Sequence, residues 1–201
     1  DNDHYVDYEK IYLSRFNVLK IAFDNAGKQG LMETEAYQKF LAENAGWLDD
    51  YALYMAVKNA FGGVCFMEWD EDIRLRKAAA LRKYRKKFAE EISFYQFQQY
   101  LFAKQWRELK AYANKKGIEI VGDIPIYVAF DSADTWANPK LFQLDKEGRP
   151  IGVAGCPPDC FSETGQLWGN PLYDWKYHKK TEYAWWMQRI AYCYQLYDVL
   201  R

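Results

Sequence analysis

The sequence is poor in cysteine, histidine and proline. It holds four Cys, two His and six Pro among 201 residues. So few cysteines argue against a disulfide-stapled secreted domain and favour reduced thiols in the cytoplasm. Cys156 and Cys160 are separated by Pro157 and Pro158, and both histidines lie elsewhere in the chain. This spacing does not suit a zinc site, so we expect no metal.

The sequence also lacks an excess of either charge and a long uncharged run. Lys and Arg number 27 and Asp and Glu 28, which gives a formal net charge of −1. A nearly neutral chain does not favour an electrostatic clamp on nucleic acid, and the frequent charges exclude a membrane span. Because half of the residues are hydrophobic, the chain can bury a core and does not have the composition of a disordered segment.

Aromatic residues are abundant instead, at 18% of the chain, with 8 Trp and 17 Tyr. Their apolar faces and polar edges suit either a thick core or a surface that grips flat, hydroxylated ligands. At about 150 residues per domain, the length predicts one domain or a piece of a larger one. The chain begins at Asp1 without an initiating Met and stops at Arg201 after an apolar run, so we expect a piece of a longer protein.

The first half of the chain has helical periodicity. Apolar residues recur at helical spacing over 6–23, from 34 to about 41, over 48–61 and over 90–116, and a basic segment covers 73–87. The turn signals that should end the first three helices are Asn25-Ala26-Gly27, Asn44-Ala45-Gly46 and Gly62-Gly63. We expect the basic segment to be a solvated helix face rather than a nucleic-acid patch. We expect the aromatic stripe to lie in the core; its members are Phe94, Phe97, Leu101, Trp106, Leu109 and Tyr112.

After Gly117 the pattern changes to a short β-branched run, 118–121, which ends at Gly122-Asp123. A helix, a tight turn and a buried strand in this order are typical of α/β barrels and doubly wound sheets. A long loop region follows from Pro125 to Trp175, then a helix over 182–197 and the opening of another strand at 198–201. A loop region of this length is usually functional or forms an inserted subdomain.

Two places could carry chemistry. Asp123 follows a strand, where it could bind substrate hydroxyls or could equally cap the next turn. The segment 153–171 surrounds Phe161 and Trp168 with Asp, Glu, Gln and Asn, a combination that suits sugar rings and their hydroxyls. The alternative is an ordered surface loop in which Trp168 fills a gap under the fold.

Several long blocks resemble the 4-α-glucanotransferases, or amylomaltases, of glycoside hydrolase family 77. The blocks are Gly122–Ala129, Asp131–Trp136, Ala154–Asp159, Gly165–Tyr173, Trp47–Lys58, Trp69–Arg76 and Gln105–Lys110. The resemblance implies an α/β fold, a helix-rich partial (β/α)8 TIM barrel of the α-amylase-like glycosidase type with an inserted loop subdomain. Residues 1–201 would then be part of the catalytic barrel, with a helical insertion at about 30–116 and a substrate-loop insertion at about 125–175.

The resemblance also implies transfer of α-1,4-glucan segments between maltooligosaccharides with retention of configuration. Retention requires a nucleophile and an acid/base carboxyl group, which in this family come after the position of Arg201. We therefore expect no complete catalytic set within these residues and no transfer by them alone. The implied partners are maltooligosaccharides and α-1,4-glucans, with no cofactor, metal, nucleic acid or membrane. The alternative is a non-catalytic or degenerate glucan-binding relative.

Particular residues match the family's substrate site. The implied substrate-binding residues are Asp123, Asp159, Cys160, Phe161, Ser162, Trp168, Asn170 and Arg201. Asp123 would bind hydroxyls near the cleaved bond, Trp168 would flank that bond, and Arg201 would adjoin the nucleophile. The loop at 159–162 would close over the glucan and exclude water. The sequence departs from the family at Cys160, where many members have Tyr, and at 64–67, for which we assign no role.

Overall fold

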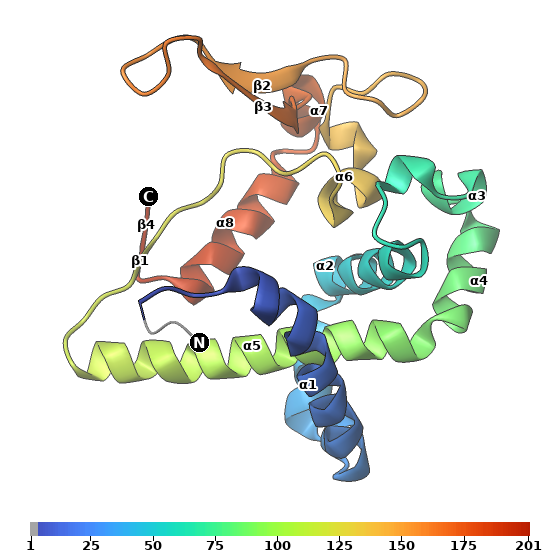
Figure 1. Cartoon of the computed structure of the whole chain (residues 1–201), viewed down its shortest axis with the longest axis vertical. Helices are drawn as coiled ribbons and strands as arrows, with labels where there is room; N and C mark the ends of the chain where they lie inside the picture. The colour runs from blue at the N-terminus through green and yellow to red at the C-terminus, as the bar shows by residue number, and fades with distance from the viewer. Residues whose placement is uncertain (1–3) are drawn as a thin grey trace.

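The computed structural model describes residues 4–201 and shows a helix-rich α/β chain (Figure 1). The α-helices are α1 (Tyr8–Lys28), α2 (Glu35–Ala60), α3 (Glu71–Arg74), α4 (Ala78–Lys87), α5 (Ala89–Lys115), α6 (Ala133–Ala137), α7 (Trp175–Lys180) and α8 (Ala184–Leu196). The strands are β1 (Val121–Gly122), β2 (Val153–Cys156), β3 (Gln166–Pro171) and β4 (Val199–Leu200). Single 3-10 turns occur at Leu31–Glu33, Phe66–Glu68 and Pro139–Leu141.

The strands form two small sheets. β1 and β4 pair in parallel, with Val121 opposite Val199 and Gly122 opposite Leu200, whereas β2 and β3 form an antiparallel hairpin. The parallel pair confirms that strands follow α5 and α8, although β1 begins at Val121 rather than at residue 118. The prediction that this strand is buried is wrong for Ile118 and Val121, whose side chains are exposed. The long loop region between β1 and α7 carries the hairpin, which stands at one end of the molecule (Figure 1).

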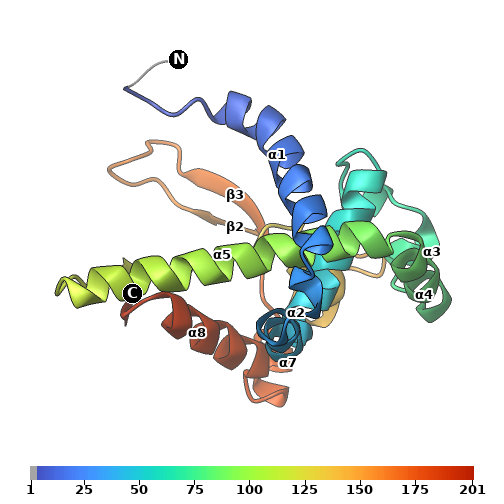
Figure 2. The same cartoon turned by 90° about the horizontal axis from the view of Figure 1, so that it is seen from below.

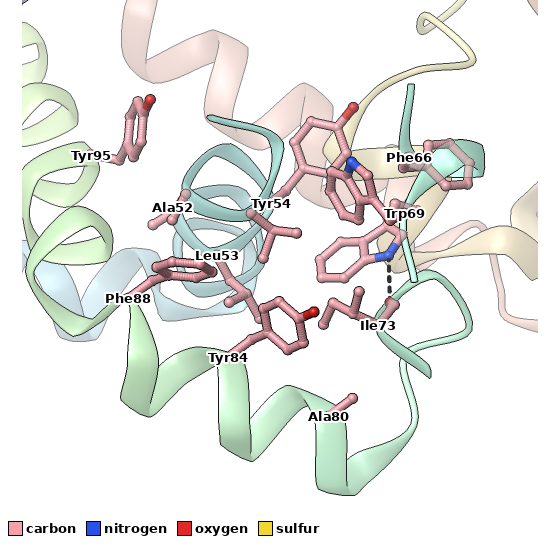
Figure 3. Close-up of a cluster of buried hydrophobic side chains, with 13 residues drawn as sticks. Ala52, Leu53, Tyr54, Phe66, Trp69, Ile73, Ala80, Tyr84, Phe88 and Tyr95 are labelled. Atoms are coloured by element: carbon pink, nitrogen blue, oxygen red, sulfur yellow. Dashed lines mark hydrogen bonds between the residues drawn. The ribbon is translucent and has the colours of Figure 1, made fainter. Parts of the chain in front are cut away.

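The main core lies between α2, α3, α4 and the first turns of α5 (Figure 3). Trp136 of α6 belongs to the same cluster. The Trp136 indole lies 5.8 Å from the ring of Tyr54 and 5.7 Å from that of Trp69. Its Nε1 donates to the Ile73 carbonyl oxygen at 3.2 Å, the dashed line in Figure 3. A second cluster joins α2 to the middle of α5 through Tyr37, Phe40, Leu48 and Tyr100. Much of the aromatic content therefore serves packing.

Two of the predicted helix ends are wrong. α1 continues through Gly27 to Lys28, and α2 is one helix that runs through Gly46 to Ala60. A glycine inside a helix costs only about 1 kcal/mol relative to alanine, which tertiary packing can offset. Gly46 has a packing reason, since a Cβ there would lie 3.1 Å from Gln188 Nε2 of α8. The predicted end at Gly62-Gly63 is confirmed, because both residues have positive φ just after α2.

The predicted basic helix over 73–87 is broken at Arg76, which has φ +54°. Its Nη2 donates to both carboxylate oxygens of Asp50 at 2.9 Å, and its guanidinium lies 4.3 Å from the centre of a Trp136 ring. Tertiary contacts therefore determine this break, and the interpretation as a solvated face is wrong for Arg76. It is confirmed for the basic residues of α4, which are exposed: Arg82, Lys83, Arg85, Lys86 and Lys87.

The aromatic stripe of α5 is buried at one end only. Phe97 is buried, and Phe94, Leu101 and Trp106 are half-buried. Leu109 and Tyr112 are exposed, so the prediction that the whole stripe lies in the core is wrong there. The reason is that α1 and α2 pack against α5 (Figure 2), whereas the C-terminal part of α5 contacts residues 196–198, which lead from α8 to β4, through Trp106, Lys110 and Asn114.

Polar side chains of α5 fix the parallel pair of strands. Asp198 Oδ2 accepts from the Ile120 N–H at 2.9 Å and from Asn114 Nδ2 at 2.8 Å, and Lys110 pairs with the same carboxylate. The Ile120 N–H bond and the Asn114 side-chain bond lower the pKa of Asp198. The strand end at Gly122 requires glycine, because a Cβ would lie 2.2 Å from the ring of Tyr197. These contacts place the carboxyl ends of β1 and β4 side by side.

Asp131 ties the segment that follows β1 to the helical core. One oxygen accepts from the Tyr54 hydroxyl at 2.6 Å and from the Phe66 N–H at 3.2 Å, and the other forms an ion pair with Lys58. Burial alone would raise the pKa of Asp131, but the hydrogen bonds from Lys58, Tyr54 and Phe66 outweigh it and lower the pKa below 3.8. The ionised form is therefore the stabilising one.

We expect Asp131→Asn to lower the free energy of unfolding at pH 7 by about 1–2 kcal/mol, because the pair is partly exposed. A lowered native pKa gives stability that is present above the unfolded pKa, about 3.9, and is lost as pH falls through the native value. The difference between the two proteins should therefore shrink between pH 5 and pH 3 in urea unfolding. Glu163→Gln, an exposed loop substitution, serves as control. A difference that does not change with pH would contradict the assignment.

Across residues 4–201, none of the helices combines the length and apolar character needed to cross a lipid bilayer.

Candidate functional site

The carboxyl ends of β1 and β4 bring Asp123 and Arg201 together. Arg201 Nε donates to Asp123 Oδ1 at 2.8 Å, and its Nη2 donates to Oδ2 at 2.7 Å. This two-bonded arrangement fixes the guanidinium and the carboxylate in one plane. The two residues are 78 positions apart in the sequence, and the parallel pairing of their strands explains why they meet.

The pair keeps Asp123 ionised. The hydrogen bonds from Arg201 lower the pKa of Asp123, and the same contacts raise the pKa of Arg201. Both side chains are largely exposed. Among the described residues, no backbone N–H donates to the Asp123 carboxylate, so the interpretation of Asp123 as a turn cap is wrong. An ionised carboxylate offers about four lone-pair positions, so two remain for hydroxyl donors beside Arg201.

The tip of the β2–β3 hairpin carries the four predicted loop residues. Asp159 Oδ1 accepts from the N–H groups of Phe161 and Ser162 at 2.9 and 3.0 Å, and Ser162 Oγ donates to the Gly165 carbonyl oxygen at 2.7 Å. Asp159 and Ser162 therefore shape the loop. The Phe161 ring is 87% exposed and Cys160 is an exposed free thiol. The loop thus presents an apolar ring on a hydrogen-bonded frame.

Glycine lets the two arms of the hairpin approach closely. A Cβ at Gly155 would lie 2.4 Å from the Gln166 carbonyl oxygen, and one at Gly165, where φ is +76°, would lie 2.6 Å from that of Cys156. Neither position tolerates a side chain without a backbone shift. The glycine content of this segment is thus explained by its geometry.

Trp168 lies on β3 with its side chain 49% exposed. Its Nε1 donates to Gln166 Oε1 at 3.0 Å, and its ring centre lies 6.2 Å from that of Tyr127. A half-exposed indole supported on one side does not fill a gap under the fold, so that alternative is wrong. The free part of the ring is available for a ligand.

The sequence analysis missed Tyr127 and Tyr173, which support Trp168. Tyr127 stacks on Tyr173 with 5.8 Å between ring centres and 10° between planes. The Tyr173 hydroxyl donates to the Ile126 carbonyl oxygen at 2.7 Å, and Asn170 Nδ2 donates to that of Val128 at 2.8 Å. Burial raises the pKa of Tyr173 to about 12, so its hydroxyl keeps the proton it donates. The sequence signal for Tyr127 was an aromatic residue only four positions after Asp123.

A comparison with protein-family models decides the family. The 4-alpha-glucanotransferase model matches residues 1–201, the whole of the chain.

The chain belongs to the 4-alpha-glucanotransferase family.

Named relatives in this family are similar over nearly all of the chain. The 4-alpha-glucanotransferase of Clostridium butyricum is 47% identical over 202 residues, covering 100% of this chain and 41% of the relative. That of Thermus thermophilus is 46% identical over 197 residues, covering 98% of this chain and 39% of the relative. The chain therefore spans about 40% of the length of these 4-alpha-glucanotransferases.

A solved structure has the same fold. The amylomaltase from Streptococcus agalactiae in complex with acarbose matches with a TM-score of 0.94 and 44% identity. The match covers 100% of this chain and 40% of that chain. The helix-rich α/β arrangement is therefore that of the corresponding part of an amylomaltase.

The predicted site residues of this family member fall into two groups. Asp123 and Arg201 meet at the strand ends, while the residues from Asp159 to Asn170 lie along the hairpin. In the part of the chain that the structure describes, no hydrogen bond or ion pair joins the two groups directly. The segment 124–130, which follows Asp123, contacts the hairpin through the Tyr127 ring beside Trp168 and the Val128 carbonyl oxygen bonded to Asn170. Across residues 4–201, no cluster of three or more His, Cys, Asp or Glu side chains is placed to hold a metal ion.

Proposed function

We propose that this chain provides substrate-binding parts of an enzyme that transfers α-1,4-glucan segments between maltooligosaccharides with retention. The observation that carries the proposal is the Asp123–Arg201 pair at the carboxyl ends of two parallel strands. The family match over 1–201 supports the reaction class. Acarbose, which the S. agalactiae relative holds, supports an oligosaccharide as ligand.

The proposed architecture is part of a (β/α)8 barrel. β1 and β4 would be neighbouring barrel strands, since they are parallel and connected through α8, which packs on α5. The helical insertion would cover about 30–116 and the substrate-loop insertion about 125–175. Active sites of such barrels gather at the carboxyl ends of the strands, which is where Asp123 and Arg201 lie.

In the proposed mechanism, Asp123 accepts hydrogen bonds from sugar hydroxyls next to the cleaved bond. Arg201 holds Asp123 ionised and in one orientation, and its positive charge favours the ionised form of a neighbouring carboxyl nucleophile. Retention then proceeds through a covalent glycosyl-enzyme, which a second sugar hydroxyl attacks. These residues therefore bind and orient the substrate, while the nucleophile and the acid/base group belong to other parts of the enzyme.

The hairpin would provide apolar contacts and exclude water. Phe161 and Trp168 offer exposed ring faces to the C–H faces of glucose units. Asp159 and Ser162 act through the loop shape that they hold, and Cys160 lies beside Phe161 at the tip. A loop that covers the covalent intermediate favours attack by a sugar over attack by water. Asn170 acts by holding the segment that follows Asp123.

We expect the chain to bind maltotriose and Trp168→Ala to weaken this binding about 10-fold. An aromatic ring contact is worth about 0.5–1.5 kcal/mol, and 1.4 kcal/mol corresponds to a factor of 10. Isothermal titration calorimetry measures both dissociation constants. Trp175→Ala is the matched control, because Trp175 is similarly exposed but lies on α7. Equal affinities for the wild-type chain and Trp168→Ala would remove Trp168 from the site, and no binding by the wild-type chain would contradict the proposed ligand.

A further inference from the structure

A pocket separate from the proposed site lies where α8 meets α2 and α6. Its volume is about 270 Å³. Its lining residues are Trp47, Asp134, Trp185, Gln188, Arg189, Tyr192 and Cys193. None of them belongs to the strand ends or to the hairpin. In Figure 2, α8 runs beside α5 and close to the end of α2, away from the free end of the hairpin.

Three aromatic rings form the apolar walls of this pocket, and hydrogen bonds fix two of them. Trp47 Nε1 donates to Asn44 Oδ1 at 3.1 Å, and Trp185 Nε1 donates to Asp134 Oδ1 at 3.2 Å. The rings of Trp47 and Tyr192 meet edge to face at 5.6 Å. Because both indole N–H groups are already bonded, the ring faces are what these residues offer to a ligand.

Polar groups of both kinds converge on the same space. Asp134 Oδ1 accepts from Trp185, so Oδ2 is the carboxylate oxygen left for a ligand donor. Gln188, exposed at the mouth, supplies a donor and an acceptor. Arg189 also lines the pocket, and its guanidinium stacks 5.2 Å from Trp185 and 5.1 Å from Trp186.

The lining indicates the class of ligand. One carboxylate and one guanidinium balance in charge, which favours a neutral ligand over an anion or a cation. Donors and acceptors beside flat apolar walls suit a molecule whose hydroxyls both donate and accept around a C–H face. The volume is slightly below the usual range for ligand pockets, about 300–1,000 Å³, so it suits one ring rather than a chain.

Gly46 of α2 lies next to Gln188 of α8. A Cβ at Gly46 would lie 3.1 Å from Gln188 Nε2, so the end of the Gln188 side chain would have to move by a few tenths of an ångström. Gln188 therefore lies against α2 beside the residue that precedes Trp47 of the pocket lining.

We propose that this pocket is a second saccharide site, which binds one pyranose unit of an α-1,4-glucan outside the proposed transfer site. The rings of Trp47, Trp185 and Tyr192 contact the sugar's C–H faces, and Asp134, Gln188 and Arg189 bind its hydroxyls. The ligand class agrees with the proposed function, but the argument rests on the lining of this pocket. The two proposals can therefore fail separately.

The test uses two thiols of the chain as reporters. Cys193 lines the pocket and Cys160 lies at the hairpin tip, and both are free. Alkylation of each by iodoacetamide is followed by peptide mass spectrometry, with and without maltotriose. At a maltotriose concentration about ten times the dissociation constant, we expect the Cys193 rate to fall about 10-fold, since the unoccupied fraction falls by that factor. Mannitol, a linear polyol, serves as the ligand control and should leave the rate unchanged.

Variants separate the two sites. Protection of Cys193 should persist in Trp168→Ala and weaken in Gln188→Ala, whereas Gln195→Ala, an exposed glutamine of α8 outside the pocket, should leave it intact. Unchanged Cys193 alkylation in the presence of maltotriose would overturn the second site, and protection of Cys160 in the same sample would leave the proposed function standing. Loss of Cys193 protection in Trp168→Ala would also overturn it, because Cys193 would then report the hairpin.

Discussion

Trp136→Ala is expected to lower the free energy of unfolding by about 3–5 kcal/mol, the range for a buried Trp or Phe replaced by Ala. The side chain is 2% exposed and contacts the rings of Tyr54 and Trp69. Its loss leaves a cavity, removes the hydrogen bond from the indole N–H to the Ile73 carbonyl oxygen, and takes away the surface on which Arg76 stacks. Urea unfolding followed by circular dichroism measures the change.

Trp168→Ala is the matched control for this substitution, because it removes the same side chain from a half-exposed position. We expect it to change the free energy of unfolding by about 1 kcal/mol or less. The two variants should therefore behave in opposite ways, one losing stability and the other losing ligand affinity. Similar destabilisation by both would mean that Trp168 is a packing residue.

Asp123→Asn is expected to lower the turnover number for maltotriose disproportionation at least about 100-fold in the proposed glucanotransferase. The amide keeps the shape of the side chain but loses its charge, and it can no longer accept both hydrogen bonds from Arg201. Loss of one preorganised electrostatic group, or a misplacement of about 1 Å beside the reacting atoms, has an effect of this size. Chromatography of the glucose and longer maltooligosaccharides formed from maltotriose measures the rate.

The melting temperature should not change in Asp123→Asn, because both members of the ion pair are largely exposed. Glu119→Gln removes another exposed carboxylate just before the same strand and should leave the rate unchanged. Since Arg201 lowers the pKa of Asp123, Asp123 should stay ionised from pH 5 to pH 8. A turnover number within a few-fold of wild type would place Asp123 outside the transfer site.

Glycines that were expected to end helices do so at one place in the chain and not at two others. Gly62-Gly63 ends α2 as predicted, whereas Gly27 and Gly46 lie inside helices. Gly46 faces Gln188, which is 142 positions later. Gly27 has no atom within 4 Å of its Cβ position, so nothing in its surroundings explains why α1 continues through it.

The residues of the proposed site could be named from the sequence, but their contacts could not. Asp123, Phe161 and Trp168 were found from a strand end and from an aromatic, polar loop, which are local features. Tyr127 and Tyr173 were missed because their role depends on stacking between segments 46 positions apart. The pairing of Asp123 with Arg201 likewise follows from strand register, which hydrophobic periodicity does not specify.

The sequence by itself determined the long helices, the positions of β1 and β4, and the family, because periodicity, turn residues and long matching blocks are local properties. It did not predict the β2–β3 hairpin, which lies in the region expected to be a loop. The tertiary structure alone decided that Arg76 breaks a helix to reach Asp50 and Trp136, that Trp168 lies on Tyr127, and that the lining of the α8 pocket comes together from three helices. Each of these features depends on packing and charge contacts between residues that are far apart in the chain. Local sequence patterns do not specify such contacts.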